Sequence, residues 1–189
     1  VQPFMVAFIL VLGFSLGSLG AVMLHHLCGG AWSFMIQRIC EAATRTLPFV
    51  FVLGLIVMVG GAFVGVYPWT DADYLHEHHI VELKTAFLNV GSYTVGYLIY
   101  FGIWIGLMLL YNKWSRDLDA SGDHRIIGKM QKLAGPGLIL YVVTVTLAAT
   151  HWTMSLEPVW FSTIYGPWMI ASFNISVIAT LVEVWDSAL

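Results

Sequence analysis

Five long apolar stretches constrain the fold of this chain more than any other feature of its sequence. Each stretch is long enough for a helix to cross the roughly 30 Å hydrocarbon core of a bilayer, which takes about 20 residues. They cover Pro3 to Leu24, Leu47 to Val66, Leu88 to Tyr111, Pro136 to Thr153 and Ser162 to Val182. No basic segment or small-residue cleavage site accompanies the first stretch, so we interpret it as a span and not as a signal peptide. The sequence therefore predicts an all-α, polytopic transmembrane protein.

Composition agrees with this class of protein. Of the 189 residues, 59% are hydrophobic and 10% are charged, whereas about a quarter of the residues in a soluble domain are charged. The net charge is −3, and the sequence has no basic patch of the kind that binds nucleic acid, so we expect no nucleic acid partner. The two cysteines, Cys28 and Cys40, form no CxxC motif, and we interpret both as packing residues.

The distribution of basic residues predicts the orientation, because cytoplasmic loops carry an excess of Lys and Arg. The connections between spans one and two and between spans three and four contain Arg38, Arg45, Lys113, Arg116, Arg125, Lys129 and Lys132. The opposite side has Lys84 among mostly acidic residues. We therefore expect the amino terminus outside and the carboxyl terminus of this segment inside.

Short connections imply antiparallel neighbours, so we expect residues 1–153 to form an up-down four-helix bundle. Residues 154–189 would supply an outer-face loop and a fifth helix that begins a further unit, and we expect the chain to be part of a longer protein. Pro48 and Pro136 are predicted in first helical turns. Glycines at helical spacing allow helices to approach closely, either within the bundle or at a dimerisation face. They are Gly13, Gly17 and Gly20 on span one, Gly61 and Gly65 on span two, and Gly102 and Gly106 on span three.

Polar residues within or beside the spans are functional candidates, because burial of ionisable groups in a membrane is costly. His151 lies near the outer end of span four, seven residues after Thr144 on the same face, and Glu157 follows in a Ser-Leu-Glu-Pro loop. Spacing places one polar stripe on span five, made of Ser172, Ser176, Thr180 and Glu183. These residues could pass protons between a deep carboxylate and an outer His/Glu pair. Alternatively, the hydroxyls bond to carbonyls four residues earlier and Glu183 reaches the cytoplasmic surface.

The histidines do not predict a haem or metal centre. A bis-histidine haem needs facing histidines at matching depth, whereas His25 and His26 lie at the inner end of span one and His151 near the outer end of span four. A loop cluster could bind a metal, but an acidic solvated loop explains it as well. That cluster contains His76, Glu77, His78 and His79. We expect no catalytic residue and no metal site in this chain.

Ordered motifs along the chain resemble a known family. The first ones are His26-Leu27-Cys28-Gly29-Gly30-Ala31-Trp32, Arg38 to Arg45 with Glu41-Ala42-Ala43-Thr44, Tyr67-Pro68-Trp69, and Phe87-Leu88-Asn89-Val90. The most specific is the run HWTMSLEPVWFSTIYG from His151 to Gly166. On these motifs the chain resembles the NrfD-like (polysulfide-reductase-type) membrane subunits, and among them the ActF-type subunit of alternative complex III, a bacterial quinol:electron-acceptor oxidoreductase. Three positions depart from the pattern: His151 replaces an aspartate, Val159 replaces a histidine, and Gly96 stands where relatives often carry an arginine.

The resemblance implies a respiratory-complex subunit of the bacterial inner (cytoplasmic) membrane that binds no redox cofactor itself. Its implied partners are iron–sulfur and cytochrome c subunits, which would carry the clusters and haem c, and a second NrfD-like subunit. Quinol, as menaquinol or ubiquinol, and protons would be handled in the membrane. This chain would contribute scaffold and a proton half-path or a quinone-facing surface. Relatives contain two four-helix bundles, of which this chain would cover the first and the opening of the second.

Two other functions fit the same residues. The chain could be a purely structural membrane anchor of such a complex, with the polar stripe serving only for packing. It could also be an independent proton or solute transporter, which predicts inverted symmetry and helices broken at mid-membrane. We expect no such break in these spans, which disfavours the transporter.

Overall fold

The described part of the chain is helical and has five helices long and apolar enough to span a membrane. A computed structural model describes residues 2–29, 34–71, 74, 81 and 83–187, and within these ranges all regular structure is helical. The segments long and apolar enough to cross a membrane are Pro3–Cys28, Ile36–Phe63, Val90–Ser121, Arg125–Leu156 and Tyr165–Glu183. The predicted all-α, polytopic class is confirmed.

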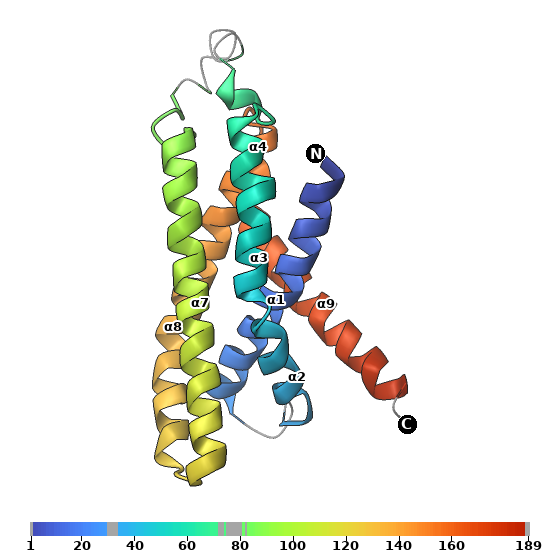
Figure 1. The fold of residues 1–189 in the computed structure, drawn as a ribbon, viewed down its shortest axis with the longest axis vertical. Coiled ribbons are helices and arrows are strands. Elements are labelled where there is room, and N and C mark those ends of the chain that lie inside the picture. Colours follow the sequence, from blue (N-terminus) through green and yellow to red (C-terminus); the bar gives the residue numbers. More distant parts are fainter. Residues whose placement is uncertain (1, 30–33, 72–73, 75–80, 82, 188–189) are drawn as a thin grey trace.

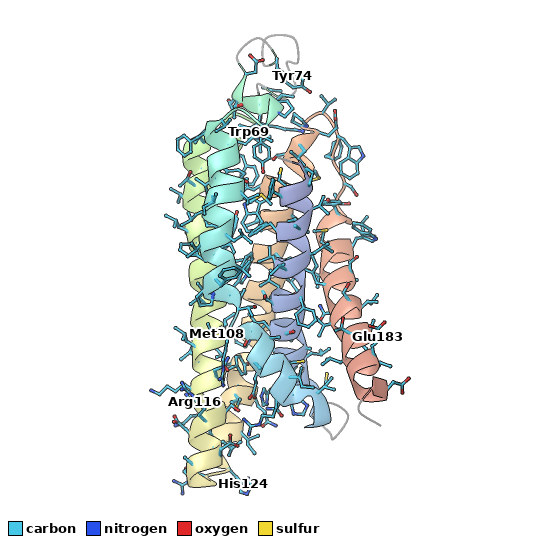
Figure 2. The ribbon with its side chains drawn as sticks, turned by 45° about the vertical axis from the view of Figure 1, so that its right-hand side comes forward. Trp69, Tyr74, Met108, Arg116, His124 and Glu183 are labelled. Atoms are coloured by element: carbon cyan, nitrogen blue, oxygen red, sulfur yellow. The ribbon has the colours of Figure 1, made fainter. Side chains whose placement is uncertain are left out.

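The five spans alternate in direction along the described part of the chain (Figure 1). The first half contains α1 (Gln2–Cys28), α2 (Phe34–Thr44), α3 (Leu47–Gly54), a π-helical segment (Leu55–Val59), α4 (Gly60–Phe63) and a 3-10 turn (Pro68–Thr70). The second half contains α7 (Val90–Ser121), α8 (Arg125–Trp152), a 3-10 turn (Met154–Leu156) and α9 (Tyr165–Ser187). Two labelled residues in Figure 2 mark opposite ends of the bundle. We call them the Trp69 end and the His124 end.

Helix α1 lies at the centre of the packing. It contacts α2, α3, α8 and α9, while α7 packs against α8 and α3. Because α9 contacts both α1 and α8, the fifth helix is part of the same packed body as the other four within this chain. That residues 154–189 open a second bundle stays a prediction.

Glycines of α1 permit the close approach of α9. A Cβ atom added at Gly17 would lie 2.7 Å from the Phe173 carbonyl carbon and 2.8 Å from Val177 Cγ2. Packing within the chain is therefore the role of this part of the α1 stripe. The other two stripes do not form helix contacts here. Gly65 follows α4 in a turn with φ of +80°, and Cβ atoms added at Gly102 and Gly106 would meet nothing within 4 Å.

Replacing Gly17 by Leu is expected to lower the free energy of unfolding by about 1–3 kcal/mol, because the side chain would force α9 away from α1. Unfolding of the detergent-solubilised protein by added dodecyl sulfate, followed by circular dichroism, measures the change. The matched control is Gly102→Leu on the open face of α7, which should stay within about 0.5 kcal/mol of wild type. Equal losses in both variants would contradict the α1–α9 contact.

The helices extend beyond the predicted spans at the His124 end. Helix α7 continues to Ser121 and α8 begins at Arg125, so both protrude past the apolar stretches that hydropathy detects. Gly122, in the left-handed conformation with φ of 64°, ends α7 and leaves only a tight connection. Pro136 consequently lies inside α8, and its predicted place in a first helical turn is wrong. Pro48 does lie in the first turn of α3, as predicted.

The second span is not a regular α-helix, but its helix continues from Leu47 to Phe63 through a π-helical segment without a break, as the sequence predicts. A turn separates α2 from α3. In it, the Arg45 and Thr46 backbone N–H groups donate to the Ala42 and Ala43 carbonyl oxygens. The π-helical segment lies between Gly54 and Gly60. The Tyr97 hydroxyl donates to the Phe51 carbonyl oxygen at 2.6 Å, just before this segment. Kinks in helices occur at wide turns of this kind and where a side chain inserts into the ladder of hydrogen bonds.

Candidate functional site

His151 lies in a buried pocket at the Trp69 end. It belongs to the last turn of α8 and is 2% exposed. Its Nδ1 atom lies 3.0 Å from the Tyr100 hydroxyl of α7, and the Phe87 ring stacks on the imidazole with a centroid distance of 4.0 Å. A Cβ atom added at Gly96 would lie 3.1 Å from Nδ1. A glycine at position 96 is therefore what leaves room for the ring.

The second ring nitrogen of His151 determines what the residue can do. Nε2 is buried and has no hydrogen-bond partner of normal geometry among the described residues, although the Phe87 backbone lies close to the ring. A neutral imidazole has one donor and one acceptor nitrogen. When Nδ1–H donates to Tyr100, Nε2 carries a lone pair and can accept a proton. When Tyr100 donates to Nδ1, Nε2 already carries the hydrogen.

Tyr67, which precedes the Pro68–Thr70 turn, bonds to both α7 and α8 beside His151. Its hydroxyl donates to the Trp152 carbonyl oxygen at 3.2 Å and lies 2.8 Å from the Tyr93 hydroxyl. The Trp152 carbonyl is at the end of α8, where the helix itself offers no partner. Burial raises the pKa of Tyr67 to about 12, partly opposed by the Tyr93 hydrogen bond. The phenol therefore stays protonated at physiological pH and remains a donor.

Thr144 shares the face of α8 that carries His151, as the sequence spacing predicts. The Trp104 indole nitrogen donates to the Thr144 hydroxyl at 2.9 Å, and that hydroxyl in turn bonds to the Leu140 carbonyl at 2.7 Å. Both Thr144 and His151 thus face α7. The pairing with Tyr100 and Trp104 could not be read from the sequence, because the four residues lie on two different helices.

An apolar hollow of about 380 Å³ lies next to this pocket. Its wall is formed by Leu83, Lys84, Ala86, Phe87, Leu88, Thr150, Met154, Ser155, Pro158, Trp160 and Phe161. Lys84 joins the two loops of the wall, since its ammonium group donates to the Pro158 carbonyl at 2.7 Å and lies 5.9 Å from the Phe161 ring centroid. Phe87 lines the hollow and stacks on His151. It therefore separates the hollow from the imidazole.

Glu157 and His151 are not in direct contact. His151 is buried, whereas Glu157 is exposed after the Met154–Leu156 turn. No hydrogen bond or ion pair of the Glu157 carboxylate is found in the described part of the chain. The predicted outer His/Glu pair therefore consists of one buried and one exposed group that do not bond to each other.

The polar stripe of α9 satisfies its hydroxyls within the helix. Ser172, Ser176 and Thr180 each donate to the carbonyl four residues earlier, at 2.9, 2.8 and 2.9 Å. Glu183 is exposed near the end of α9, where Figure 2 labels it. The sequence left two interpretations of the stripe open, and these bonds are the ones expected from the second, in which the hydroxyls bond to carbonyls four residues earlier. A role of these four residues in proton transfer stays a prediction.

The structure has a second polar cluster, at the His124 end, that the sequence did not predict. Glu41 of α2 is 2% exposed and accepts hydrogen bonds from Gln37 at 2.9 Å, Arg38 at 3.2 Å and Ser115 of α7 at 2.8 Å. Arg38 also pairs with Asp119. The sequence places this segment in a connection between spans, which gives no reason to expect a buried carboxylate. The signal that could have revealed it is the helical spacing of Gln37, Arg38 and Glu41.

Other histidines lie away from His151 or outside the described residues. His26 stacks on Tyr111 near the His124 end, with a centroid distance of 5.5 Å. The predicted separation of His26 from His151 is therefore confirmed. The loop cluster of His76, Glu77, His78 and His79 lies outside the described residues.

No family model matches this chain, and no curated protein matches it. The resemblance to the NrfD-like subunits therefore rests on the ordered motifs of the sequence. Two of the three positions that depart from the family pattern, Gly96 and His151, are direct neighbours in the structure. They come from different helices, so the sequence did not predict that they would meet.

Proposed function

We propose that this chain is a membrane subunit of a bacterial quinol-oxidising respiratory complex and that His151 accepts a proton there. The observation that carries the proposal is the contact between Gly96 and His151, at 3.1 Å for an added Cβ atom. An arginine and an aspartate at these two positions, as in the family pattern, would lie within reach of an ion pair. In this chain, glycine stands in place of that arginine and histidine in place of that aspartate, so one ionisable group remains at the same point. The proximity of the two positions supports the resemblance to the family.

The chemistry of quinol oxidation requires such a group somewhere in the complex. Two protons leave a quinol together with its two electrons, and the electrons would pass to cofactors in partner subunits. His151 can accept a proton at Nε2 when its Nδ1–H donates to Tyr100. Glu157 directly precedes Pro158 in the wall of the hollow and is exposed, which suits the release of protons to water.

The hollow beside Phe87 is suited to an aromatic headgroup, because sites for such ligands are lined mainly by apolar side chains with few polar groups. Phe87 separates this hollow from His151. A headgroup in the hollow would therefore reach the imidazole only after the Phe87 ring turns aside.

Gentle detergent extraction from native membranes tests the complex itself. We expect co-purification with haem c and iron–sulfur proteins and a second NrfD-like subunit, identified by mass spectrometry and by the absorption spectrum. A lone, colourless membrane protein would contradict the proposal and leave the transporter as the function to test.

Replacing His151 by Phe in the intact complex is expected to slow quinol-dependent turnover about a hundredfold, the lower part of the range for loss of a general base. Phenylalanine keeps the ring stacked on Phe87 but has no nitrogen. The matched control is Thr153→Val, which removes a hydroxyl at the same end of α8 whose hydrogen bond, among the described residues, is to the Ala149 carbonyl. Turnover should then be within about twofold of wild type, since no proton-accepting group is lost.

A structural anchor is the second candidate function. The observation that favours it is the α9 stripe, whose hydroxyls are all used within their own helix. Unchanged turnover of the His151→Phe complex, with all subunits still assembled, would exclude proton acceptance by His151 and favour the anchor.

A further inference from the structure

We infer that Arg45 and Arg116 bind the phosphate headgroup of an anionic phospholipid at the His124 end. We call these two residues the arginine pair. The inference concerns the opposite end of the bundle from His151 and does not rest on the proposed function.

Both guanidinium groups are attached to one buried residue. Arg45 donates from Nε to the Asn112 side-chain oxygen at 2.8 Å, and Arg116 donates from Nε to the Asn112 backbone oxygen at 3.2 Å. Asn112 is 5% exposed and is itself held by bonds to Thr44 and to the Met108 carbonyl, both at 3.0 Å. Both side chains are therefore held beside Asn112. Because each is anchored through Nε, the terminal nitrogens remain available for a ligand.

The arginine pair has no carboxylate partner among the described residues. The ion pairs found in this part of the chain join Arg38 to Glu41 and to Asp119, so these two carboxylates already have a basic partner. Asp117 follows Arg116 in sequence, but a step of about 100° along the helix turns it to another side.

A bound anion would offset the repulsion within the pair. Two fixed positive groups repel one another more strongly at a membrane surface than in bulk water, because the effective dielectric constant is lower. Terminal guanidinium nitrogens match the geometry of phosphate oxygens.

Apolar surface leads from the arginine pair toward the middle of the membrane. On the segment that begins with α3, Phe49, Val52 and Ile56 are 67, 55 and 70% exposed and recur at helical spacing. On α7, Leu109 is 57% exposed, two turns before Arg116. Helices α3 and α7 pack against each other, as Figure 1 shows.

This arrangement selects a phospholipid over a free phosphate ion. The exposed apolar side chains belong to the membrane-spanning segments, where acyl chains surround them, and Figure 2 places Arg116 on α7 between Met108 and His124. A headgroup bound by the arginine pair would direct its acyl chains along this surface. Basic pockets between transmembrane helices on the cytoplasmic side bind anionic headgroups in this way.

Lipid binding to the protein, solubilised with its native partners and stripped of loosely bound lipid, tests the inference. Native mass spectrometry would follow titrations with dioleoyl phosphatidylglycerol and with zwitterionic dioleoyl phosphatidylcholine. We expect Arg45→Gln and Arg116→Gln each to weaken phosphatidylglycerol binding about tenfold, the effect of losing one charge-assisted hydrogen-bonding group. The double variant should lose the preference for phosphatidylglycerol. The matched control, Arg125→Gln with Lys129→Gln, removes the same charge at the same end and should bind as wild type does.

Several outcomes would overturn the inference. They are unchanged phosphatidylglycerol binding in the double variant, an equal loss in the control, or no preference for phosphatidylglycerol in the wild type. Displacement of the lipid by inorganic phosphate at equal concentration would assign the site to free phosphate instead. If the double Gln variant does not fold, Arg45→Lys with Arg116→Lys keeps the charge but removes the planar donors. Its phosphatidylglycerol binding should still fall, and unchanged binding would overturn the inference equally.

Discussion

Replacing Trp152 by Ala is expected to lower the free energy of unfolding by about 3 kcal/mol, at the lower end of the range for large-to-small changes in a core. The indole is 1% exposed. Its ring centroid lies 6.1 Å from that of Phe8 on α1, and 5.5 and 5.9 Å from those of Tyr97 and Trp104 on α7. One side chain of α8 thus joins three helices.

The lower end of the range applies because of the membrane. Separated helices remain in lipid, which is as apolar as the protein interior, so little transfer free energy is lost. The cost comes from the cavity and from the van der Waals contacts that it removes.

Unfolding by dodecyl sulfate in mixed micelles, followed by circular dichroism, measures the effect of Trp152→Ala. Trp168→Ala is the matched control, since that indole is 59% exposed and its loss should cost about 0.5 kcal/mol or less. If both variants lost equal stability, the packing of Trp152 against Phe8, Tyr97 and Trp104 would not be a main source of stability.

The second large effect is expected from Glu41→Leu, which should lower the free energy of unfolding by about 2–3 kcal/mol. Ser115, 3% exposed, and Gln37 would lose their acceptor, and an unsatisfied buried donor is costly. Breaking a fully buried ion pair costs about 3–5 kcal/mol. The lower value applies because Arg38 is 57% exposed and keeps Asp119 as its partner.

Two variants separate the charge of Glu41 from its hydrogen bonds. Glu41→Gln retains an acceptor for Ser115 and should cost about 1 kcal/mol. Asp119→Asn is the control at the exposed end of the same ion-pair network, where loss of a surface pair should cost about 1 kcal/mol or less. A Glu41→Leu protein as stable as wild type in the same dodecyl sulfate titration would show that apolar packing replaces the carboxylate without loss.

The sequence predicted one half of the His151 site. His151 was a candidate because an ionisable residue inside a membrane span is costly and therefore informative. Its partners Tyr100, Gly96 and Phe87 were not predicted, since they come from α7 and the loop before it. Contacts between helices distant in sequence depend on how each helix is rotated about its axis, and hydropathy does not report that rotation.

Glu41 shows a different reason for failure. Hydropathy detects only the part of a helix that lies in lipid, so the sequence predicts α2 and the polar ends of α7 and α8 only as connections between spans. Packing of α2 against α7 buries Glu41, Asn112 and Ser115, and only the assembled helices reveal that burial.

The sequence by itself determined the class of the protein and the number and order of its spans. The physical reason is that a backbone in lipid must satisfy its own hydrogen bonds, which leaves helices as the structure for apolar segments of this length. The tertiary structure alone decided which polar groups meet. Lipid solvates every apolar helix face equally well, so close packing of small residues such as Gly17 and pairing of groups such as Arg45 with Asn112 select the arrangement of the helices.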